Sequence, residues 1–326
     1  MASYKEKLNW ANCELSQYGF RMKKYSWTQS YLKGFYDFES SFTVDGVNHT
    51  GRGIDRRPLV ASVKSLCESL ESYIMSQGSF VTSSSGLSVH VDRHAAYKHA
   101  LNEIVERDCF LTHYLTKTPF HTISDDISNY VSICTKVGLN VRFGLGYSAF
   151  ENLSTVICKI DLSAFDLGFV IGLGTSETLS VAIEKSFLEA YCRSIPFVAI
   201  VSIKSSPLSR YEFASKKQWC STDHYRIGLC PDNKSMENMF STKSFVKKYK
   251  AIDFNSIDLI ERNVCDHVPL IAASKFGSVY LTSDKLQRHF TGPTSNSKIN
   301  QERLSQFRLS LGIVKNVIND IPHPLG

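Results

Sequence analysis

The sequence predicts an α+β fold in which repeated strand–loop–helix units pack helices on mixed β-sheets. One phrase occurs three times: a Gly, an Ala ten residues later, and a Glu seven residues after that. Each copy runs into apolar residues at helical spacing, and β-branched or aromatic runs bounded by turn residues lie between these helices. The three copies are Gly51, Ala61 and Glu68; Gly86, Ala96 and Glu103; and Gly172, Ala182 and Glu189.

The first copy predicts a helix over residues 58–76. Pro58 suits the first helical turn, because its missing N–H would have no partner there. A buried apolar stripe recurs at helical spacing, and Glu68 and Glu71 fall off it. The stripe consists of Leu59, Val63, Leu66, Leu70 and Ile74.

The second and third copies repeat this logic. A helix over 93–116 gathers apolar side chains on one face, while Glu103 and Glu106 project from the other. A third helix, at about 178–194, carries Glu189 and Arg193. In each unit we expect a strand, then a loop at the Gly, then the helix.

Strands are predicted where β-branched and aromatic residues are dense, and the last third adds a loop and a helix. The predicted strands are 141–147, 155–161, 169–171, 198–203, 268–273 and 278–282, with a polar loop over 291–298 and a helix over 301–318. We expect an N-terminal segment (1–50), a core (51–205) and a C-terminal part of the same domain (206–326).

Composition excludes several classes of protein. At 326 residues and 43% hydrophobic content the chain can bury a large core. Nine cysteines without a CxxC pair argue against a disulfide framework and a zinc site. The formal charge of +6 favours anionic partners, but the basic runs are too short to predict nucleic-acid binding. No apolar run predicts a membrane span or a secretory signal, so a cytoplasmic protein is expected.

The two glutamate pairs, Glu68 with Glu71 and Glu103 with Glu106, are the chemical signal in the repeat. A single such pair on a helix is usually solvated and merely stabilises the helix. Equivalent carboxylates on repeated helices indicate that the helices converge, and converging carboxylates need a cation between them. Oxygen ligands without His or Cys favour Mg²⁺. Arg107 and Arg193 would then supply guanidinium groups for phosphate oxygens.

These motifs, in this order, resemble the YcaO domains. The resemblance covers about residues 50–195 and the C-terminal tail. It rests on an ExxE helix, a Ser- and Gly-containing segment leading into a helix that ends ExxERD, a later helix with Glu and Arg, and a proline-containing C-terminus. Here these are Glu68 to Glu71; Ser85-Gly86-Leu87-Ser88 with Glu103, Glu106, Arg107 and Asp108; Glu189 to Arg193; and Pro322-His323-Pro324.

The resemblance implies a YcaO-type fold around a nucleotide cleft and an ATP- and Mg²⁺-dependent enzyme. Such an enzyme phosphorylates a backbone amide oxygen of a ribosomal precursor peptide, so that a Cys, Ser or Thr side chain closes a thiazoline or oxazoline ring. The implied roles are Mg²⁺ binding by Glu68, Glu71, Glu103 and Glu106, nucleotide binding by Ser88, Arg107, Glu189 and Arg193, and a catalytic role for Pro322, His323 and Pro324.

The chain departs from the family pattern near the nucleotide. Val91 and Ala95 stand where many members carry Asn and Glu, and Cys192 replaces a usual Gln. His90 and Asp92 match a form found in heterocyclising members, which favours azoline formation. The tail ends PHPLG rather than PxPxP.

The resemblance also implies partners beyond the precursor peptide. These are a leader-peptide-binding protein of the E1-like or RRE kind and an FMN-dependent dehydrogenase acting on the product; a homodimer within such a complex is left open. Two alternatives stay open as well. The same ATP chemistry could install a thioamide or amidine with another nucleophile, or the chain could be a non-catalytic peptide-binding scaffold.

Overall fold

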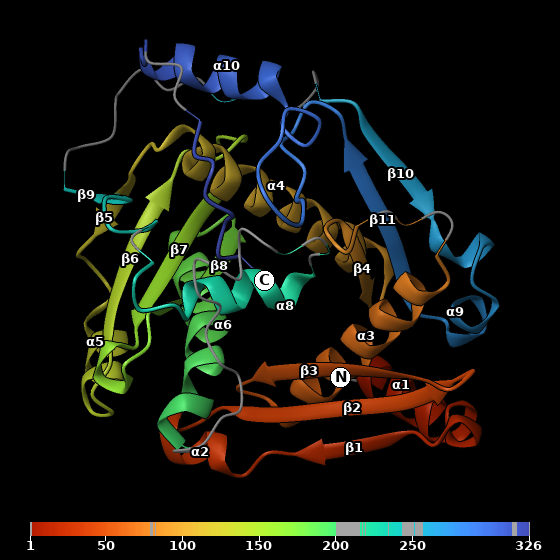
Figure 1. The fold of residues 1–326 in the computed structure, drawn as a ribbon. Helices are drawn as coiled ribbons and strands as arrows, with labels where there is room; N and C mark the ends of the chain where they lie inside the picture. The colour runs from red at the N-terminus through yellow and green to blue at the C-terminus, as the bar shows by residue number, and fades with distance from the viewer. Residues whose placement is uncertain are drawn as a thin grey trace. The chain divides into compact units, whose positions relative to one another are not determined.

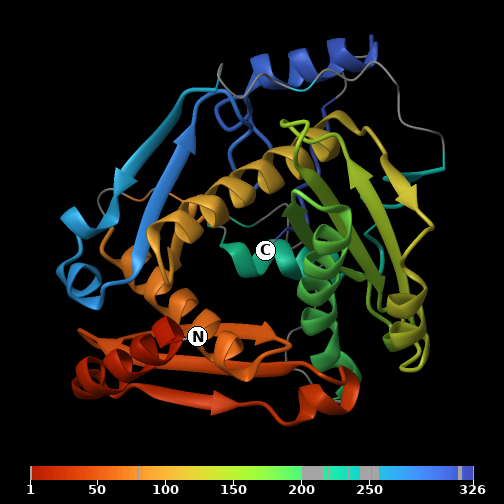
Figure 2. The same cartoon turned by 180° about the vertical axis from the view of Figure 1, so that it is seen from behind.

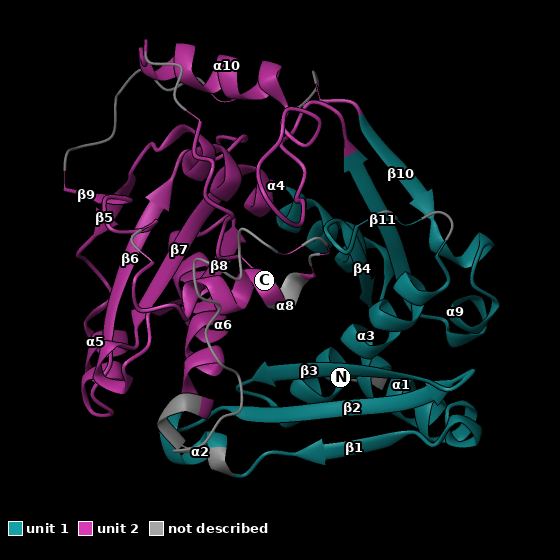
Figure 3. Cartoon of the chain, viewed as in Figure 1, with its two compact units in different colours: residues 1–104, 259–282 teal, residues 105–258, 283–326 magenta. Residues whose placement is uncertain are grey.

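The structure is a computed structural model that describes residues 2–78, 81, 83–199, 216, 218, 220–233, 235–242, 251, 257–314 and 318–325 (Figure 1). It divides into two compact units, each described by itself. Unit 1 comprises residues 1–104 and 259–282, and unit 2 comprises 105–258 and 283–326 (Figure 3). This division runs along other lines than the predicted segments 1–50, 51–205 and 206–326, which stay a prediction.

Unit 1 begins with an antiparallel sheet in the order β1 (Arg21–Lys24), β2 (Tyr36–Val44) and β3 (Val47–Asp55). Helices α1 (Ala2–Glu14) and α3 (Pro58–Ser76) pack together in one apolar core, and Figure 2 shows both on the same face of this sheet. A strand ahead of Gly51 was expected, and β3 lies there, whereas β1 and β2 were missed because polar residues interrupt their apolar ones.

A second sheet of unit 1 has the order β10 (Leu259–Asn263), β11 (Gly277–Ser283) and β4 (Leu87–His90). Strands β4 and β11 run antiparallel, with Ser88 opposite Val279. Helix α9 (Pro269–Ser274) precedes β11. The two sheets and α3 share one core, which includes Leu66, Leu70 and Val89.

Unit 2 contains a five-stranded mixed sheet. Its order is β8 (Phe169–Ser176), β7 (Ser154–Asp161), β6 (Asn140–Gly146), β5 (Phe120–Ile123) and β9 (Phe240–Ser241). All neighbours are antiparallel except β5 and β9, which are parallel. The other helices of this unit include α5 (Ser128–Thr135), α6 (Leu179–Ala199), α8 (Ser221–Gly228) and α10 (Gln301–Leu311). The α+β class with a mixed sheet is therefore confirmed.

The first and third copies of the repeated phrase form the same structural unit, an edge strand packed against the helix that follows it. A Cβ atom added at Gly51 of β3 would lie 2.2 Å from the backbone N of Ser69 in α3. At Gly172 of β8 it would lie 2.3 Å from the carbonyl O of Ser186 in α6. Both glycines lie inside their strands, so the prediction of a loop at the Gly was wrong. The glycines let strand and helix backbones touch.

The second copy is built differently. Gly86 occupies a turn with φ +85°, ahead of β4 rather than after a strand. Helix α4 (Arg93–Thr116) then begins under a side-chain cap, because the Ala95 N–H donates to Asp92 Oδ1 at 2.8 Å. Asp92 therefore has a structural role at the start of α4. The helix crosses from unit 1 into unit 2 at residue 105.

The helices predicted over 58–76 and 93–116 are confirmed, whereas two other predictions were wrong. The run 268–273 forms helix α9 rather than a strand, and Pro269 occupies its first turn. Residues 198–199 end helix α6, and the rest of the strand predicted over 198–203 lies outside the described residues. Helix α10 stops at Leu311 because Gly312 adopts the left-handed conformation.

Candidate active site

Three of the predicted metal ligands are held by backbone N–H groups in unit 1. Glu68 Oε2 accepts from the Arg52 N–H at 2.8 Å, and Glu71 Oε1 accepts from the Val89 N–H at 2.7 Å. Glu103 Oε2 accepts from the Gly86 N–H at 3.2 Å. Arg52 and Val89 belong to β3 and β4, the edge strands of their sheets. The two carboxylates of α3 therefore bind strand edges, and that of α4 binds the turn ahead of β4; these bonds fix the direction of all three.

These carboxylates influence one another electrostatically. Burial raises the pKa of Glu71 well above its usual range, and the charges of Glu103 and Glu68 raise it further. The hydrogen bond from Val89 opposes this shift. A cation between the carboxylates would remove the repulsion, which is the arrangement Mg²⁺ prefers.

The donor set therefore fits Mg²⁺ in chemistry. The ligand set is incomplete, since no three His, Cys, Asp or Glu side chains of the described residues are grouped closely enough to hold a metal ion. Water and phosphate oxygens commonly complete a Mg²⁺ site. Glu106, the fourth predicted ligand, lies three residues after Glu103 on α4, half-buried and in unit 2.

Ser88, predicted to contact the nucleotide, lies on β4 with only 5% of its surface exposed. His90 shares its face of the strand, because side chains two residues apart point the same way. The His90 ring lies 5.3 Å from that of His99 on α4. Its Nδ1 atom is buried and has no hydrogen-bond partner among the described residues. Unit 1 thus brings the imidazole rings of β4 and α4 together.

Glu189 and Arg193 form a pair on α6 in unit 2. Glu189 Oε1 lies 2.9 Å from Arg193 Nη2, while its Oε2 accepts from the Leu173 N–H at 2.6 Å. Arg193 Nη1 donates to the Ile171 carbonyl at 3.2 Å. The pair therefore binds both a donor and an acceptor on edge strand β8, in the same way that Glu68 binds β3.

Arg107 lies beside the C-terminal tail within unit 2. Its positive charge lowers the pKa values of His289 and His323, after the larger effect of their burial. The tail itself is buried: His323 is 1% exposed and Leu325 is inaccessible. Tyr114 OH also donates to the Pro322 carbonyl at 3.1 Å. The tail residues predicted to be catalytic are thus packed in place next to Arg107.

Asp108 is a buried anchor that the sequence reasoning gave no role. Arg303 of α10 donates to it through two nitrogens, Nε at 2.9 Å and Nη2 at 2.7 Å. The Gln287 N–H donates to the same carboxylate at 2.7 Å. Asp108 is inaccessible and Arg303 is 2% exposed. The ERD triplet was the available signal, because Asp108 follows two predicted site residues directly.

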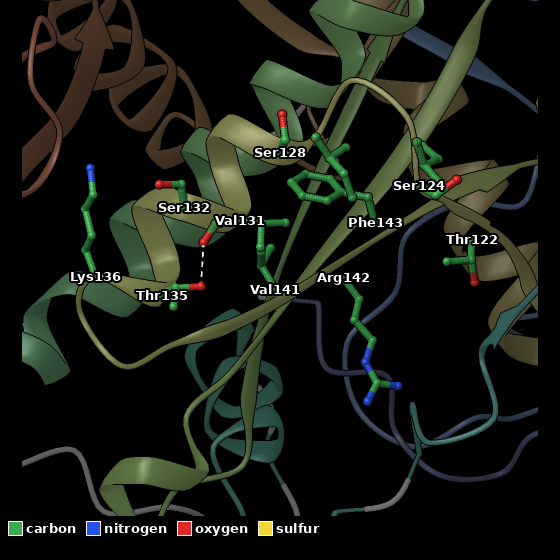
Figure 4. A pocket seen from close by; sticks show the side chains of 12 residues that line it. Thr122, Ser124, Ser128, Val131, Ser132, Thr135, Lys136, Val141, Arg142 and Phe143 are labelled. Atoms are coloured by element: carbon green, nitrogen blue, oxygen red, sulfur yellow. Dashed lines mark hydrogen bonds between the residues drawn. The ribbon is translucent and has the colours of Figure 1, made fainter.

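A cavity of about 710 Å³ lies elsewhere in unit 2, between α5 and strands β5 and β6 (Figure 4). Apolar side chains such as Val131 and Phe143 line it together with several hydroxyl groups. Lys136 and Arg142 are its cationic residues. None of the predicted site residues lines this cavity.

Sequence comparison identifies the family. A family model described as YcaO cyclodehydratase, ATP- and Mg²⁺-binding, matches residues 67–251, more than half of the chain. The chain belongs to the YcaO cyclodehydratase family. It is therefore an ATP-dependent enzyme, and its cofactors are ATP and Mg²⁺. No curated protein matches the chain.

The chain is also similar to solved structures at low sequence identity. A heterocyclase in complex with substrate and cofactor is 11% identical with a TM-score of 0.61, over 93% of this chain and 54% of that one. The microcin synthetase McbBCD complex of E. coli is 11% identical with a TM-score of 0.51, over 80% of this chain and 86% of its own. YcaO from Methanopyrus kandleri, bound with AMPPCP and Mg²⁺, is 16% identical with a TM-score of 0.45, over 57% of this chain and 66% of that one. The chain thus spans about half of the heterocyclase chain.

In the part of the chain that the structure describes, no helix has the length and apolar character required to cross a membrane.

Proposed function

We propose that this YcaO enzyme activates a backbone amide of a ribosomal precursor peptide as the cyclodehydratase subunit of a peptide-modifying complex. A Cys, Ser or Thr side chain of the peptide attacks the preceding carbonyl carbon. This attack closes the five-membered ring. The former carbonyl oxygen then receives the γ-phosphoryl group of ATP, with release of ADP, and leaves as phosphate while the amide nitrogen loses its proton, so that the C=N bond of a thiazoline or oxazoline forms. The observation that carries the proposal is that backbone N–H groups of unit 1 hold Glu68, Glu71 and Glu103, in a family that binds ATP and Mg²⁺. The charges of Glu68 and Glu103 also raise the pKa of Glu71, after the larger effect of its burial.

The proposed roles follow from where the side chains lie. Glu68, Glu71, Glu103 and Glu106 would hold Mg²⁺, which when bound offsets the charge of the triphosphate. The backbone N–H bonds to three of them keep these carboxylates oriented. Because the carboxylates are already oriented, less free energy is needed to rearrange them when charge develops on the transferred phosphoryl group.

The nucleotide and tail residues complete the assignment. Ser88, Arg107, Glu189 and Arg193 would contact the nucleotide or order its phosphates. The pairing of Glu189 with Arg193 keeps that guanidinium in one orientation. Residues Pro322, His323 and Pro324 would lie against the reacting amide, and their burial beside Arg107 supports a fixed position for them.

The proposed partners are the precursor peptide and a separate leader-binding protein of the E1-like or RRE kind. An FMN-dependent dehydrogenase and a homodimer within the complex belong to the same proposal. The fold shared with a chain of the E. coli microcin synthetase complex supports an assembly of this kind. The peptide itself would be recognised largely outside this chain.

The test is reconstitution with the partner protein and a candidate precursor peptide, followed by mass spectrometry. Azoline formation removes one water per ring and requires ATP. A gain of sulfur mass in place of a water loss would instead support the thioamide alternative, and ATP-independent binding of an unmodified peptide would support the scaffold.

Glu103→Gln is the decisive variant for this test, and Glu14→Gln, at an exposed position of α1, is its matched control. We expect Glu103→Gln to abolish both Mg²⁺-dependent binding of a non-hydrolysable ATP analogue and the water loss. Full activity of Glu103→Gln would contradict the proposed metal site.

A further inference from the structure

Three imidazole rings surround the C-terminal tail inside unit 2. The ring of His224, from α8, stacks on that of His323 with centroids 4.2 Å apart and planes inclined by 18°. The ring of His289 lies 5.2 Å from that of His323. Neither contact follows from sequence spacing, because the residues come from three separate segments of the chain.

The hydrogen bonds determine which ring nitrogen of His224 carries the proton. The Gly292 N–H donates to His224 Nε2 at 2.7 Å, so this nitrogen must have a free lone pair. The proton of the neutral ring is therefore on Nδ1, which donates to the His323 carbonyl at 2.6 Å. His224 thus links the tail to the segment around Gly292 in one tautomer only.

The other two rings bind the tail as well. His323 Nε2 donates to the Phe290 carbonyl at 2.8 Å, and His289 is hydrogen-bonded to the Leu325 backbone. Residues 289 and 290 are themselves anchored, because the nearby Gln287 N–H donates to the buried Asp108 carboxylate. The tail is therefore held by hydrogen bonds to a segment that is fixed to α4.

The charged groups around the rings disfavour protonation. Burial is the largest cause of the lowered pKa of each of the three histidines. Arg107 acts in the same direction on His289 and His323, and Lys298 acts so on His224. The histidines also disfavour charge on one another, and the acidic group that opposes this is Asp223, beside His224.

We propose that His224 and His289 are positioning residues: as neutral imidazoles they clamp the tail residues 322–325 beside Arg107 for the amide-activating reaction, and protonation of the clamp releases the tail. This inference rests on the proposed function for the purpose of the clamp, but the docking of the tail can be measured without any reaction. A protonated His224 would aim a second N–H at the Gly292 N–H, two donors without an acceptor. Acid should therefore open the clamp from the His224 side.

The experiment measures hydrogen exchange of the peptide covering 318–325 by mass spectrometry, on the full chain with its partner protein. His224→Phe keeps a ring of similar size but removes the donor and the acceptor. We expect exchange in this peptide to become faster on the order of tenfold or more, as for the loss of a buried hydrogen bond. His94→Phe, at an exposed position on α4, is the control and should leave exchange unchanged.

His224→Asn provides the conservative rescue. Its side-chain amide keeps a donor near the position of Nδ1 and cannot be protonated in this pH range. We expect the tail of this variant to stay protected from exchange at pH 7.5. At pH 5 the wild type should exchange faster in this peptide, after correction for the intrinsic pH dependence of exchange, and the variant should not. Long-range ¹H–¹⁵N spectra should show His224 as the Nδ1–H tautomer at neutral pH.

Three results would overturn the proposal: an Nε2–H or charged His224 at pH 7.5, unchanged tail exchange in His224→Phe, or a released tail with undiminished water loss from the peptide. The supporting result is a released tail with reduced water loss and intact binding of a non-hydrolysable ATP analogue. Failure of the proposed function is distinguishable, because the wild type would then give no water loss while His224→Phe still released the tail.

Discussion

Single side chains in this YcaO protein show a conflict between stability and function, and Glu71 is its clearest case. Its carboxylate is half-buried near Glu68 and Glu103, and its pKa is raised. Above the unfolded pKa of about 4.5, the unfolded state gives up this proton more readily than the folded state. The free energy of unfolding therefore falls as the pH rises from there through the folded pKa.

We predict that Glu71→Gln stabilises the protein at pH 7.5 in the absence of Mg²⁺. The amide oxygen can still accept from the Val89 N–H, while the buried charge and its repulsion disappear. The melting temperature should rise by about 2 °C or more in thermal unfolding. The stabilisation of the wild type by Mg²⁺ and ATP analogue should be reduced in the variant. An unchanged response to these ligands would rule out a metal-binding role for Glu71.

The pair of Asp108 and Arg303 leads to a prediction about stability alone. Both side chains are buried, and removal of one charge leaves the other without compensation. We expect Asp108→Asn to lower the free energy of unfolding by about 3 kcal/mol in urea. The double variant Asp108→Leu with Arg303→Met should be less costly than the sum of its single changes. Additive costs would show that the two residues do not act as a pair.

The repeated phrase singled out individual residues, whose roles in the site stay predictions. Glu68 and Glu103 were chosen because they occupy equivalent positions in two copies of the phrase. Asp108, His224 and His289 were missed because their partners are remote in sequence. Arg303 lies on α10, and the hydrogen bond and ring stacking of His224 with His323 join positions 99 residues apart.

At the scale of elements, hydrophobic periodicity predicted the long helices well and the short elements poorly. Helices α3 and α4 have the predicted limits because 19 and 24 residues provide several turns of pattern. Helix α9 has only 6 residues, too few to distinguish a helix from a buried strand. The polar residues of β2 likewise hid a strand of nine residues.

The repeated glycines predict a specific cost at the strand–helix contact. Gly172→Ala would place a methyl group 2.3 Å from the Ser186 carbonyl oxygen and 2.4 Å from the Ala190 nitrogen. Because both are backbone atoms, β8 and α6 must separate. We expect a loss of about 3 kcal/mol or more in urea unfolding, comparable to severe overpacking.

Gly138→Ala is the control for this prediction. Gly138 has φ +75° and open space around its Cβ position, so its substitution costs about 1 kcal/mol of backbone strain without a clash. Equal losses for the two variants would show that β8 and α6 can separate freely.

At the scale of the whole molecule, the family match and the architecture agree, although identity to the heterocyclase and to the microcin synthetase chain is only 11%. Chains with very different sequences are expected to share a fold when they keep the same pattern of strands, helices and close contacts. The α+β class was predictable for this reason. The division into two units was not, because unit 1 takes up residues 259–282 from late in the chain.

The two units differ in how many histidines with lowered pKa values they contain, and so should differ in their sensitivity to acid. Six histidines have lowered pKa values, and burial is the largest cause for each. Unit 1 contains His49 and His90, whereas unit 2 contains His113 and the three clamp histidines. The pKa of His113 falls to about 4 and that of His289 to about 3, from 6.5.

We therefore predict that acid destabilises unit 2 more than unit 1. Since the folded pKa values are lower, the unfolded state binds more protons below pH 6.5, and stability is lost from there down through the folded values. For His113 and His289, whose folded pKa values are about 4 and about 3, the loss is about 2 kcal/mol each between pH 7.5 and pH 5. Hydrogen exchange at these two pH values should show core amides of β6 and β7 losing more protection than those of β2 and β3. Equal losses in the two units would show that their unfolding is one cooperative event.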